Sequence, residues 1–254
     1  MKLTYKEYKR LIDCPYENKL MWTRQIIGMA IKQSKSFLVS LSWGKDSVVM
    51  SHIIYTICKN GNYVFANTMC EYPETYKYRD FMLNNSFIKE CKYFETKPIK
   101  TFFECVNLYG FPSLRQNTGQ GNKRMPKCCN YLKEIPLNNW KKENKIDLTF
   151  MGIQATESMN RRLLFMRLGG LYFSKTRNEN VCIPMAIWND DDILRYAKEN
   201  DIALNPLYKT MKRTGCMFCT GFKSWKRIMA KYDKKMYEKI LLKTDGQAII
   251  KECY

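Results

Sequence analysis

Apolar runs and helical patterns alternate along the middle of the chain. The apolar runs lie at 37–41, 63–66 and 148–153, and apolar positions at helical spacing follow at 47–59, 74–91 and 190–200. This alternation is typical of a parallel sheet wrapped by helices. We therefore expect a Rossmann-like α/β fold, in which ligands bind beyond the carboxyl ends of the strands.

The flanking segments predict helices. Residues 1–35 carry helical patterns and predict a helical lead-in to an α/β domain over residues 36–208. Residues 209–254 contain a Cys-x-x-Cys turn, and apolar residues from Trp225 to Ile240 recur at helical spacing. We expect this C-terminal helix to pack on the same domain.

The first apolar run breaks into the turn Ser42-Trp43-Gly44-Lys45-Asp46-Ser47, after which the chain becomes helical. Gly44 allows the backbone to approach phosphate oxygens, Lys45 offers an ammonium group, and N–H groups at the start of a helix attract anions. Asp46 can cap the helix or help to place a magnesium ion. The spacing is not that of a Walker motif. The turn therefore predicts a polyphosphate site, and the alternative is an ordinary strand-to-helix turn with a solvent-facing lysine.

Four cysteines form a second candidate site. Cys128 and Cys129 are adjacent, and Cys216 and Cys219 form the Cys-x-x-Cys turn. A Cys-x-x-Cys turn directs two sulfurs at one soft metal, whereas adjacent cysteines rarely both bind a tetrahedral zinc. The pattern favours a 4Fe-4S cluster, and the alternatives are a structural zinc site or four unliganded thiols.

Both sites belong to a wider resemblance that runs from about Ser36 to Trp225. The turn at Ser42–Ser47 resembles the PP-loop of the N-type ATP pyrophosphatases, Ser-Gly-Gly-Lys-Asp-Ser, with Trp43 in place of a glycine. The chain as a whole resembles the phosphoadenylyl-sulfate (PAPS) reductase family, including its iron-sulfur members. The stretches that carry the resemblance are Glu71-Tyr-Pro-Glu74-Thr, Lys127-Cys-Cys-Asn-Tyr-Leu-Lys, Gly152-Ile-Gln-Ala-Thr-Glu157-Ser, Arg161-Arg162 and Asn205-Pro-Leu-Tyr208.

The resemblance implies a role for each of these residues. It makes Lys45, Asp46, Glu157 and Arg161 candidate catalytic residues. The implied nucleotide-binding residues are Ser42, Trp43, Gly44, Lys45, Asp46, Ser47, Thr68, Glu74, Gly152 and Arg162. Cys128, Cys129, Cys216 and Cys219 are the implied cluster ligands. Cys253 and Cys70 are candidates for a nucleophile or a sulfur carrier.

The complete Gly44-Lys45-Asp46-Ser47 run favours one reaction of the family, because the sulfonucleotide reductases usually have a degenerate loop. The run predicts that ATP with Mg is split into AMP and pyrophosphate to activate a substrate for sulfur incorporation, as in the DNA phosphorothioation ATPase. One alternative is a PAPS or adenylyl-sulfate reductase that uses Cys253 and takes electrons from thioredoxin or glutathione. Another is a non-catalytic module that binds nucleic acid and senses nucleotide or redox state.

Charge bears on the partner. Lysine and arginine number 43 against 24 acids, for a net charge of +19, which favours a polyanion such as DNA or RNA. The alternative is an evenly solvated basic surface. The phosphorothioation resemblance adds a cysteine desulfurase or another sulfur donor as an expected partner.

The cysteines bear on the compartment. Eleven cysteines without a recognisable signal peptide suggest a reducing cytoplasm, since a metal needs reduced thiols. No apolar run approaches the length of a membrane span, so we expect no membrane contact.

Overall fold

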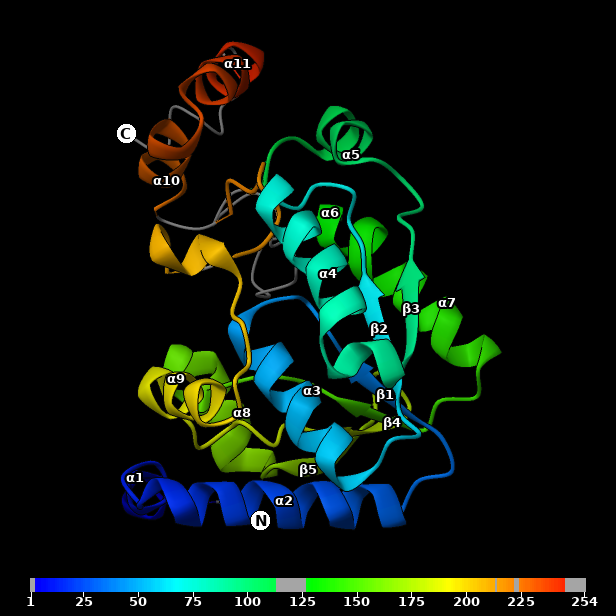
Figure 1. Cartoon of the computed structure of the whole chain (residues 1–254). Coiled ribbons are helices and arrows are strands. Elements are labelled where there is room, and N and C mark those ends of the chain that lie inside the picture. Colours follow the sequence, from blue (N-terminus) through cyan, green and yellow to red (C-terminus); the bar gives the residue numbers. More distant parts are fainter. Residues whose placement is uncertain (1–2, 113–126, 213, 222–223, 245–254) are drawn as a thin grey trace. The chain divides into compact units, whose positions relative to one another are not determined.

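The computed structural model describes residues 3–112, 127–212, 214–221 and 224–244 (Figure 1). They form two compact units. The first comprises Met1–Phe65, Glu74–Glu95 and Lys141–Pro206, and the second draws on Ala66–Pro73, Thr96–Trp140 and Leu207–Tyr254. Each unit is built from several separate stretches of chain. The domain boundaries after residues 35 and 208 stay a prediction.

The first unit contains nearly all of the sheet and the helices that cover it. Its strands are β1 (Phe37–Ser40), β2 (Asn62–Ala66), β3 (Lys92–Thr96), β4 (Leu148–Phe150), β5 (Leu171–Ser174) and β6 (Glu179–Cys182). Its helices are α1 (Tyr5–Ile12), α2 (Tyr16–Lys32), α3 (Lys45–Ile57), α4 (Pro73–Asn85), α8 (Met159–Leu168) and α9 (Asp190–Glu199), with short 3-10 helices η1 (Phe87–Glu90) and η4 (Ala155–Glu157).

The sheet confirms the predicted Rossmann-like fold. Its six strands have the order β3-β2-β1-β4-β6-β5. β1 is parallel to both β2 and β4, and β4 is parallel to β6, with Phe37 opposite Leu148 and Leu148 opposite Asn180. Only β5 among the described pairs runs antiparallel, on β6. The carboxyl ends of β1, β4 and β6 therefore lie side by side.

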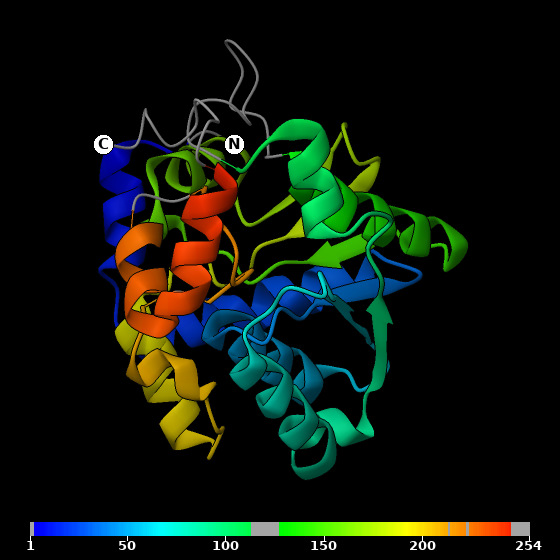
Figure 2. The same ribbon diagram turned by 90° about the horizontal axis from the view of Figure 1, so that it is seen from above.

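Helices cover this sheet because their apolar faces need burial. α3 packs on β1 and against α2 and α9, and α3 and α4 lie on the same side of the sheet (Figure 2). The core includes Leu38, Val39 and Phe150 from the strands and Val49 and Ile53 from α3, all fully buried. This packing fixes the amino end of α3, where the predicted polyphosphate turn lies.

The second unit is mainly helical. It contains α5 (Phe102–Tyr109), α6 (Lys127–Cys129), a π-helical turn η3 (Asn130–Glu134), most of α7 (Ile135–Glu143), η5 (Pro206–Lys209), α10 (Trp225–Tyr232) and α11 (Lys234–Thr244). Phe102, Phe111, Leu132, Trp225 and Met229 are buried together in its core. The apolar spacing over Trp225–Ile240 predicts one helix, but Asp233 leaves helical geometry and its carboxylate accepts from the amide of Met236, so two helices form.

No helix in the described part of the chain is both long and apolar enough to cross a membrane.

A buried ion pair joins α7 to the sheet within the first unit. Lys141 donates to Oε1 of Glu179 at 2.7 Å, and Thr149 donates to Oε2 at 2.9 Å. All three residues are buried. Both carboxylate oxygens thus have partners, which a buried charge requires.

We expect Glu179→Ala to lower the free energy of unfolding by about 3–5 kcal/mol, because Lys141 would be left charged and buried without its partner. Urea denaturation followed by circular dichroism measures this. The double variant Lys141→Met with Glu179→Leu is the control, and it should recover most of the loss. A loss below about 1 kcal/mol for Glu179→Ala would contradict the assignment.

Candidate functional site

The turn between β1 and α3 closes on itself through hydroxyl groups. The amide of Ser42 donates to Oγ of Ser47 at 3.1 Å, the two serine hydroxyls lie 3.0 Å apart, and Ser47 Oγ donates to the carbonyl of Gly44 at 2.9 Å. Gly44 is the N-cap of α3 and supplies no side-chain cap. The opening turn of α3 therefore presents backbone N–H groups that can bind an anion.

The backbone of Trp43 explains why glycine suits the second position of this turn. Its φ is 59°, in the left-handed region that favours glycine. The indole ring compensates by being fully buried, where it packs against Phe65, Tyr78 and Tyr93 with centroids 5.6–6.3 Å apart. The ring thus lies in the core, and only the backbone of Trp43 belongs to the turn. Asn205 secures it by donating to the Trp43 carbonyl at 3.4 Å.

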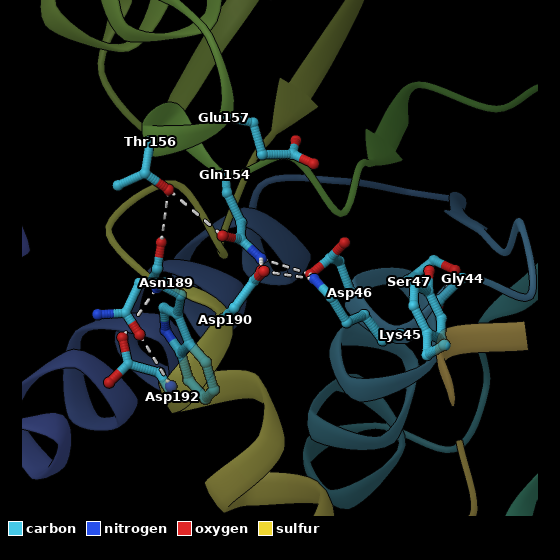
Figure 3. A network of polar contacts seen from close by, with 12 residues as sticks. Gly44, Lys45, Asp46, Ser47, Gln154, Thr156, Glu157, Asn189, Asp190 and Asp192 are labelled. Atoms are coloured by element: carbon cyan, nitrogen blue, oxygen red, sulfur yellow. Dashed lines mark hydrogen bonds and ion pairs between the residues drawn. The ribbon is translucent and has the colours of Figure 1, made fainter. Parts of the chain in front are cut away.

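Lys45 lies between two carboxylates. Its ammonium donates to Asp190 at 2.6 Å and to Asp46 at 3.0 Å, and Gln154 donates to the same Asp46 oxygen. Figure 3 shows Asp46, Gln154 and Asp190 pointing toward one another. Burial alone would lower the pKa of Lys45, but the hydrogen bond to Asp190 and the charge of Asp46 outweigh it and raise that pKa above its ordinary value. The lysine is therefore held charged at the start of α3.

Gln154 and Asp190 are the residues of this network that sequence reasoning misses. Asp190 is one of three acids that open α9, a pattern that ordinarily indicates only favourable helix electrostatics. Gln154 lies inside the Gly152–Glu157 stretch that carries the family resemblance. Gln154 follows β4 and Asp190 follows β6 along the chain. Because β4 and β6 run parallel to β1, these residues reach the start of α3, where Gln154 contacts Asp46 and Asp190 contacts Lys45.

Gly152 makes that approach possible. A Cβ added to Gly152 would lie 3.0 Å from both the Cα and the backbone nitrogen of Ser47. Such a distance is tighter than ordinary van der Waals contact and involves backbone, which cannot rotate away. Gly152 therefore lies directly against the turn. The other predicted residues of this group belong to the turn itself: Ser42, Gly44, Lys45, Asp46 and Ser47.

The remaining predicted residues of the first unit are more dispersed. Glu157 ends η4 and pairs with Arg161 on α8, one turn later. The guanidinium of Arg162 lies over the ring of Tyr8, 5.6 Å from its centroid. Glu74 lies in the first turn of α4. Their contact with a nucleotide stays a prediction.

The second unit places the Cys-x-x-Cys turn beside the segment that follows β2. Glu71 and Cys216 form an isolated antiparallel bridge, and the amide of Met217 donates to the carbonyl of Cys70 at 2.7 Å. Thr68 donates to Glu71 at 2.9 Å and accepts from the thiol of Cys216 at 3.5 Å. The segment after β2 and the Cys-x-x-Cys turn thus lie side by side, with Thr68 and Cys70 beside the thiols.

Electrostatic coupling links the four motif cysteines. The thiol of Cys128 donates to Cys129, which lowers the pKa of Cys129 to about 7 and raises that of Cys128, and Cys216 and Cys219 raise the latter further. Burial raises the pKa of Cys216 to about 12, against the opposing charge of Lys133. Burial also raises the pKa of Cys70 to about 11.

Lys133 is a positive charge among these thiols that sequence reasoning did not assign to the site. Burial alone would lower its pKa, but the negative charges of Cys216, Glu71 and Cys129 outweigh that effect and raise it. Its ammonium lies 4.0 Å from the carboxylate of Glu71. Lys133 lies in the same sequence motif as Cys128 and Cys129, four residues after Cys129, and this spacing could have identified it.

The thiols form a loose group. Within the described residues, no three side chains of His, Cys, Asp or Glu converge closely enough to hold a metal ion, although the four thiols influence one another's pKa. The donor set itself, four thiols beside a cation, fits an iron-sulfur cluster better than a hard metal ion. Cys253 lies outside the described residues.

Comparisons with known proteins give a family match and several relatives. Residues 36–222 match the family model of the phosphoadenosine phosphosulfate reductase domain. A phosphoadenosine 5'-phosphosulfate reductase of Buchnera aphidicola is 28% identical over 171 residues, which cover 67% of this chain and 64% of that protein, so the match spans less than two thirds of that relative. An adenosine 5'-phosphosulfate reductase of Bacillus cereus is 24% identical over 225 residues, covering 86% of this chain and 88% of the relative.

Solved structures show a similar fold. The phosphoadenylyl-sulfate reductase of Candida auris superposes with a TM-score of 0.58 at 14% identity, covering 85% of this chain and 97% of that one. The FMN adenylyltransferase of Candida glabrata gives a TM-score of 0.53 at 11% identity, covering 82% and 67%. At these identities the likeness concerns the fold alone.

We expect Gly152→Ala to weaken anion binding at the turn at least about tenfold, because the added methyl group would push the end of β4 away from the backbone of Ser47. Calorimetry with inorganic pyrophosphate measures this. Gly28→Ala is the control, because no atom lies within 4 Å of its added Cβ. Equal affinities for the two variants would show that the close approach does not shape the site.

We also expect Cys129 in metal-free protein to be alkylated with a midpoint near pH 7, as its lowered pKa requires. Cys128→Ala should move this midpoint upward, because the thiolate loses its hydrogen-bond donor. Cys128→Ser keeps an O–H donor and should hold the midpoint low. Labelling with iodoacetamide at a series of pH values, followed by mass spectrometry, tests this, and an unmoved midpoint in Cys128→Ala would refute the coupling.

Proposed function

The chain belongs to the phosphoadenosine phosphosulfate reductase domain family, and from this premise we propose that it binds an adenine sulfonucleotide and reduces its sulfate group to sulfite. The observation that carries the proposal is that the family match over residues 36–222 includes both the anion-binding turn and all four motif cysteines. The names of the curated relatives support this reaction over others of the fold.

The turn Ser42–Ser47 is the proposed site for the anionic end of the nucleotide. Its amides and the ammonium of Lys45 offer the positive charge that a phosphosulfate needs. Asp46 would orient the ammonium group of Lys45 through their hydrogen bond. Gly152 would leave room for the backbone of the turn. Glu157 and Arg161, together with Glu74 and Arg162, are proposed to complete the nucleotide site in the first unit, and a nucleotide contact of Thr68 stays a prediction.

The proposed chemistry needs thiols. A thiolate attacks the sulfur of the sulfonucleotide, the S–O bond to the phosphate breaks, and AMP leaves with the electron pair. A second thiolate then attacks the Sγ atom of the resulting S-sulfocysteine, the bond from Sγ to the sulfonate sulfur breaks, sulfite leaves with the electron pair, and a disulfide remains. Cys253 is the proposed nucleophile, with Cys70 as the alternative, and thioredoxin or glutathione would supply the second thiol and the reducing electrons.

A 4Fe-4S cluster is the proposed cofactor of the second unit. Cys128, Cys129, Cys216 and Cys219 would hold it, and the low pKa of Cys129 favours the thiolate that such a ligand requires. When bound, the cluster would add its own charge beside the thiols that hold it. Lys133 would neutralise part of the negative charge of the thiolates.

A second candidate reaction is favoured by the intact turn. Lys45 is buried and held charged at the amino end of α3, where it could offset charge that develops on a leaving pyrophosphate. In this reaction ATP with Mg would be split to AMP and pyrophosphate, and the activated substrate, DNA or RNA, would receive sulfur from a cysteine desulfurase or another donor. The net charge of +19 supports a polyanionic partner.

We expect Lys45→Ala to lower turnover at least about 100-fold in either reaction, because the anion loses its one buried ammonium partner in the turn. Lys59→Ala is the control, since it removes the same charge from an exposed position just beyond α3. The assay supplies adenosine 5'-phosphosulfate with thioredoxin or glutathione, or ATP with Mg and nucleic acid, to anaerobically purified protein.

The products separate the candidates. Sulfite and AMP from the sulfonucleotide would support the reductase, and AMP and pyrophosphate from ATP would support the second candidate. Binding of either nucleotide without products would favour a non-catalytic sensor. Unchanged turnover in Lys45→Ala would remove the turn from the mechanism.

A further inference from the structure

Asp190 contacts Lys45, but neither candidate reaction gives it a role. It lies in the first turn of α9, and its carboxylate accepts from Lys45 at 2.6 Å, closer than Asp46 at 3.0 Å. The side chain of Asp190 is 67% exposed, whereas that of Lys45 is only 9% exposed. A solvent-facing carboxylate thus covers a buried ammonium group.

The backbone of Asp190 is firmly positioned. Asn189 and Asp192 form a capping box at the start of α9, and Asp192 accepts from the buried Lys19 at 2.7 Å. The carbonyl of Trp188 accepts from Thr156 at 3.3 Å. These contacts hold the backbone at Asp190, so its carboxylate can be displaced by a rotation of the side chain alone.

The local charge balance is unfavourable for an anion. Two carboxylates, Asp46 and Asp190, face one ammonium group, so a phosphate or sulfate that approaches the start of α3 meets negative charge beside Lys45. Asp46 cannot easily leave, because it is itself on α3 and accepts a hydrogen bond from Gln154. Asp190 is the carboxylate that can be displaced, since its contact with Gln154 is long, at 3.5 Å, and its 67% exposed side chain can be solvated once it turns outward.

We propose that Asp190 is a positioning residue that occupies Lys45 in the ligand-free protein and sets the affinity of the turn for its anion. The anion takes the place of the Asp190 carboxylate on Lys45, and the carboxylate turns outward. Asp190 keeps the buried lysine charged and oriented, and it makes weakly charged anions poor competitors. This inference rests on the proposed role of the turn as the anion site.

The test uses inorganic pyrophosphate as the probe, because both candidate reactions present an anhydride of two tetrahedral anions to the turn. Calorimetry in EDTA at low salt gives its affinity for the wild-type protein, Asp190→Asn, Asp191→Asn and Lys45→Ala. Asp191 is the matched control, because it is an exposed acid in the same helical turn and its change removes the same charge. Asp190→Asn should bind pyrophosphate about three- to tenfold more tightly than Asp191→Asn.

The outcomes are distinguishable. Equal affinities for the two aspartate variants, or weaker binding by Asp190→Asn, would overturn the role of Asp190 while leaving the turn as the anion site. In a second titration with Mg²⁺ in place of EDTA, loss of binding by Asp190→Asn alone would assign the carboxylate to metal binding and also overturn the proposal. Equal binding by Lys45→Ala and wild type would instead refute the proposed function of the turn.

Discussion

The parallel pairing of β1, β4 and β6 is the constraint on which the candidate site depends. Because these strands are neighbours with the same direction, the segments that follow them meet at one edge of the sheet. Lys45 and Asp190 are 145 residues apart in sequence, yet their charged atoms lie 2.6 Å apart. Gly152 permits this convergence, because no side chain separates the end of β4 from the backbone of Ser47.

Local patterns could predict the parts of this arrangement but not their contacts. The apolar runs and helical spacing predict β1, α3, β4 and α9, because each buries a regular face. β6 escapes prediction, since it is a short strand that begins with the buried Glu179, whose charge is balanced by Lys141 from α7. The contact of Lys45 with Asp190 could not be predicted from sequence either, because it depends on the order of the strands in the sheet rather than on residues close in sequence. The left-handed backbone of Trp43 could not be predicted either, because tryptophan rarely adopts that conformation.

The two units carry different chemistry. The first unit holds an ammonium group among backbone donors, which suits an anion, and the second gathers thiols around Lys133 and Glu71, which suits soft-metal or redox chemistry. The proposed sulfonucleotide reductase would use the first unit for its anionic substrate and the second for the proposed cluster. An ATP-splitting enzyme needs the first for the leaving pyrophosphate and can use the second only for sulfur transfer or for structure. The balance between the two reactions therefore rests on what the thiols do, rather than on the turn.

A crystal structure of the protein with bound adenosine 5'-phosphosulfate tests the central claim most directly, namely that the turn before α3 is the anion site. We expect an oxygen of the phosphosulfate within about 3 Å of Lys45 Nζ and of the first amides of α3, with the Asp190 carboxylate turned toward solvent. A nucleotide bound elsewhere, with Lys45 still paired to Asp190, would contradict it.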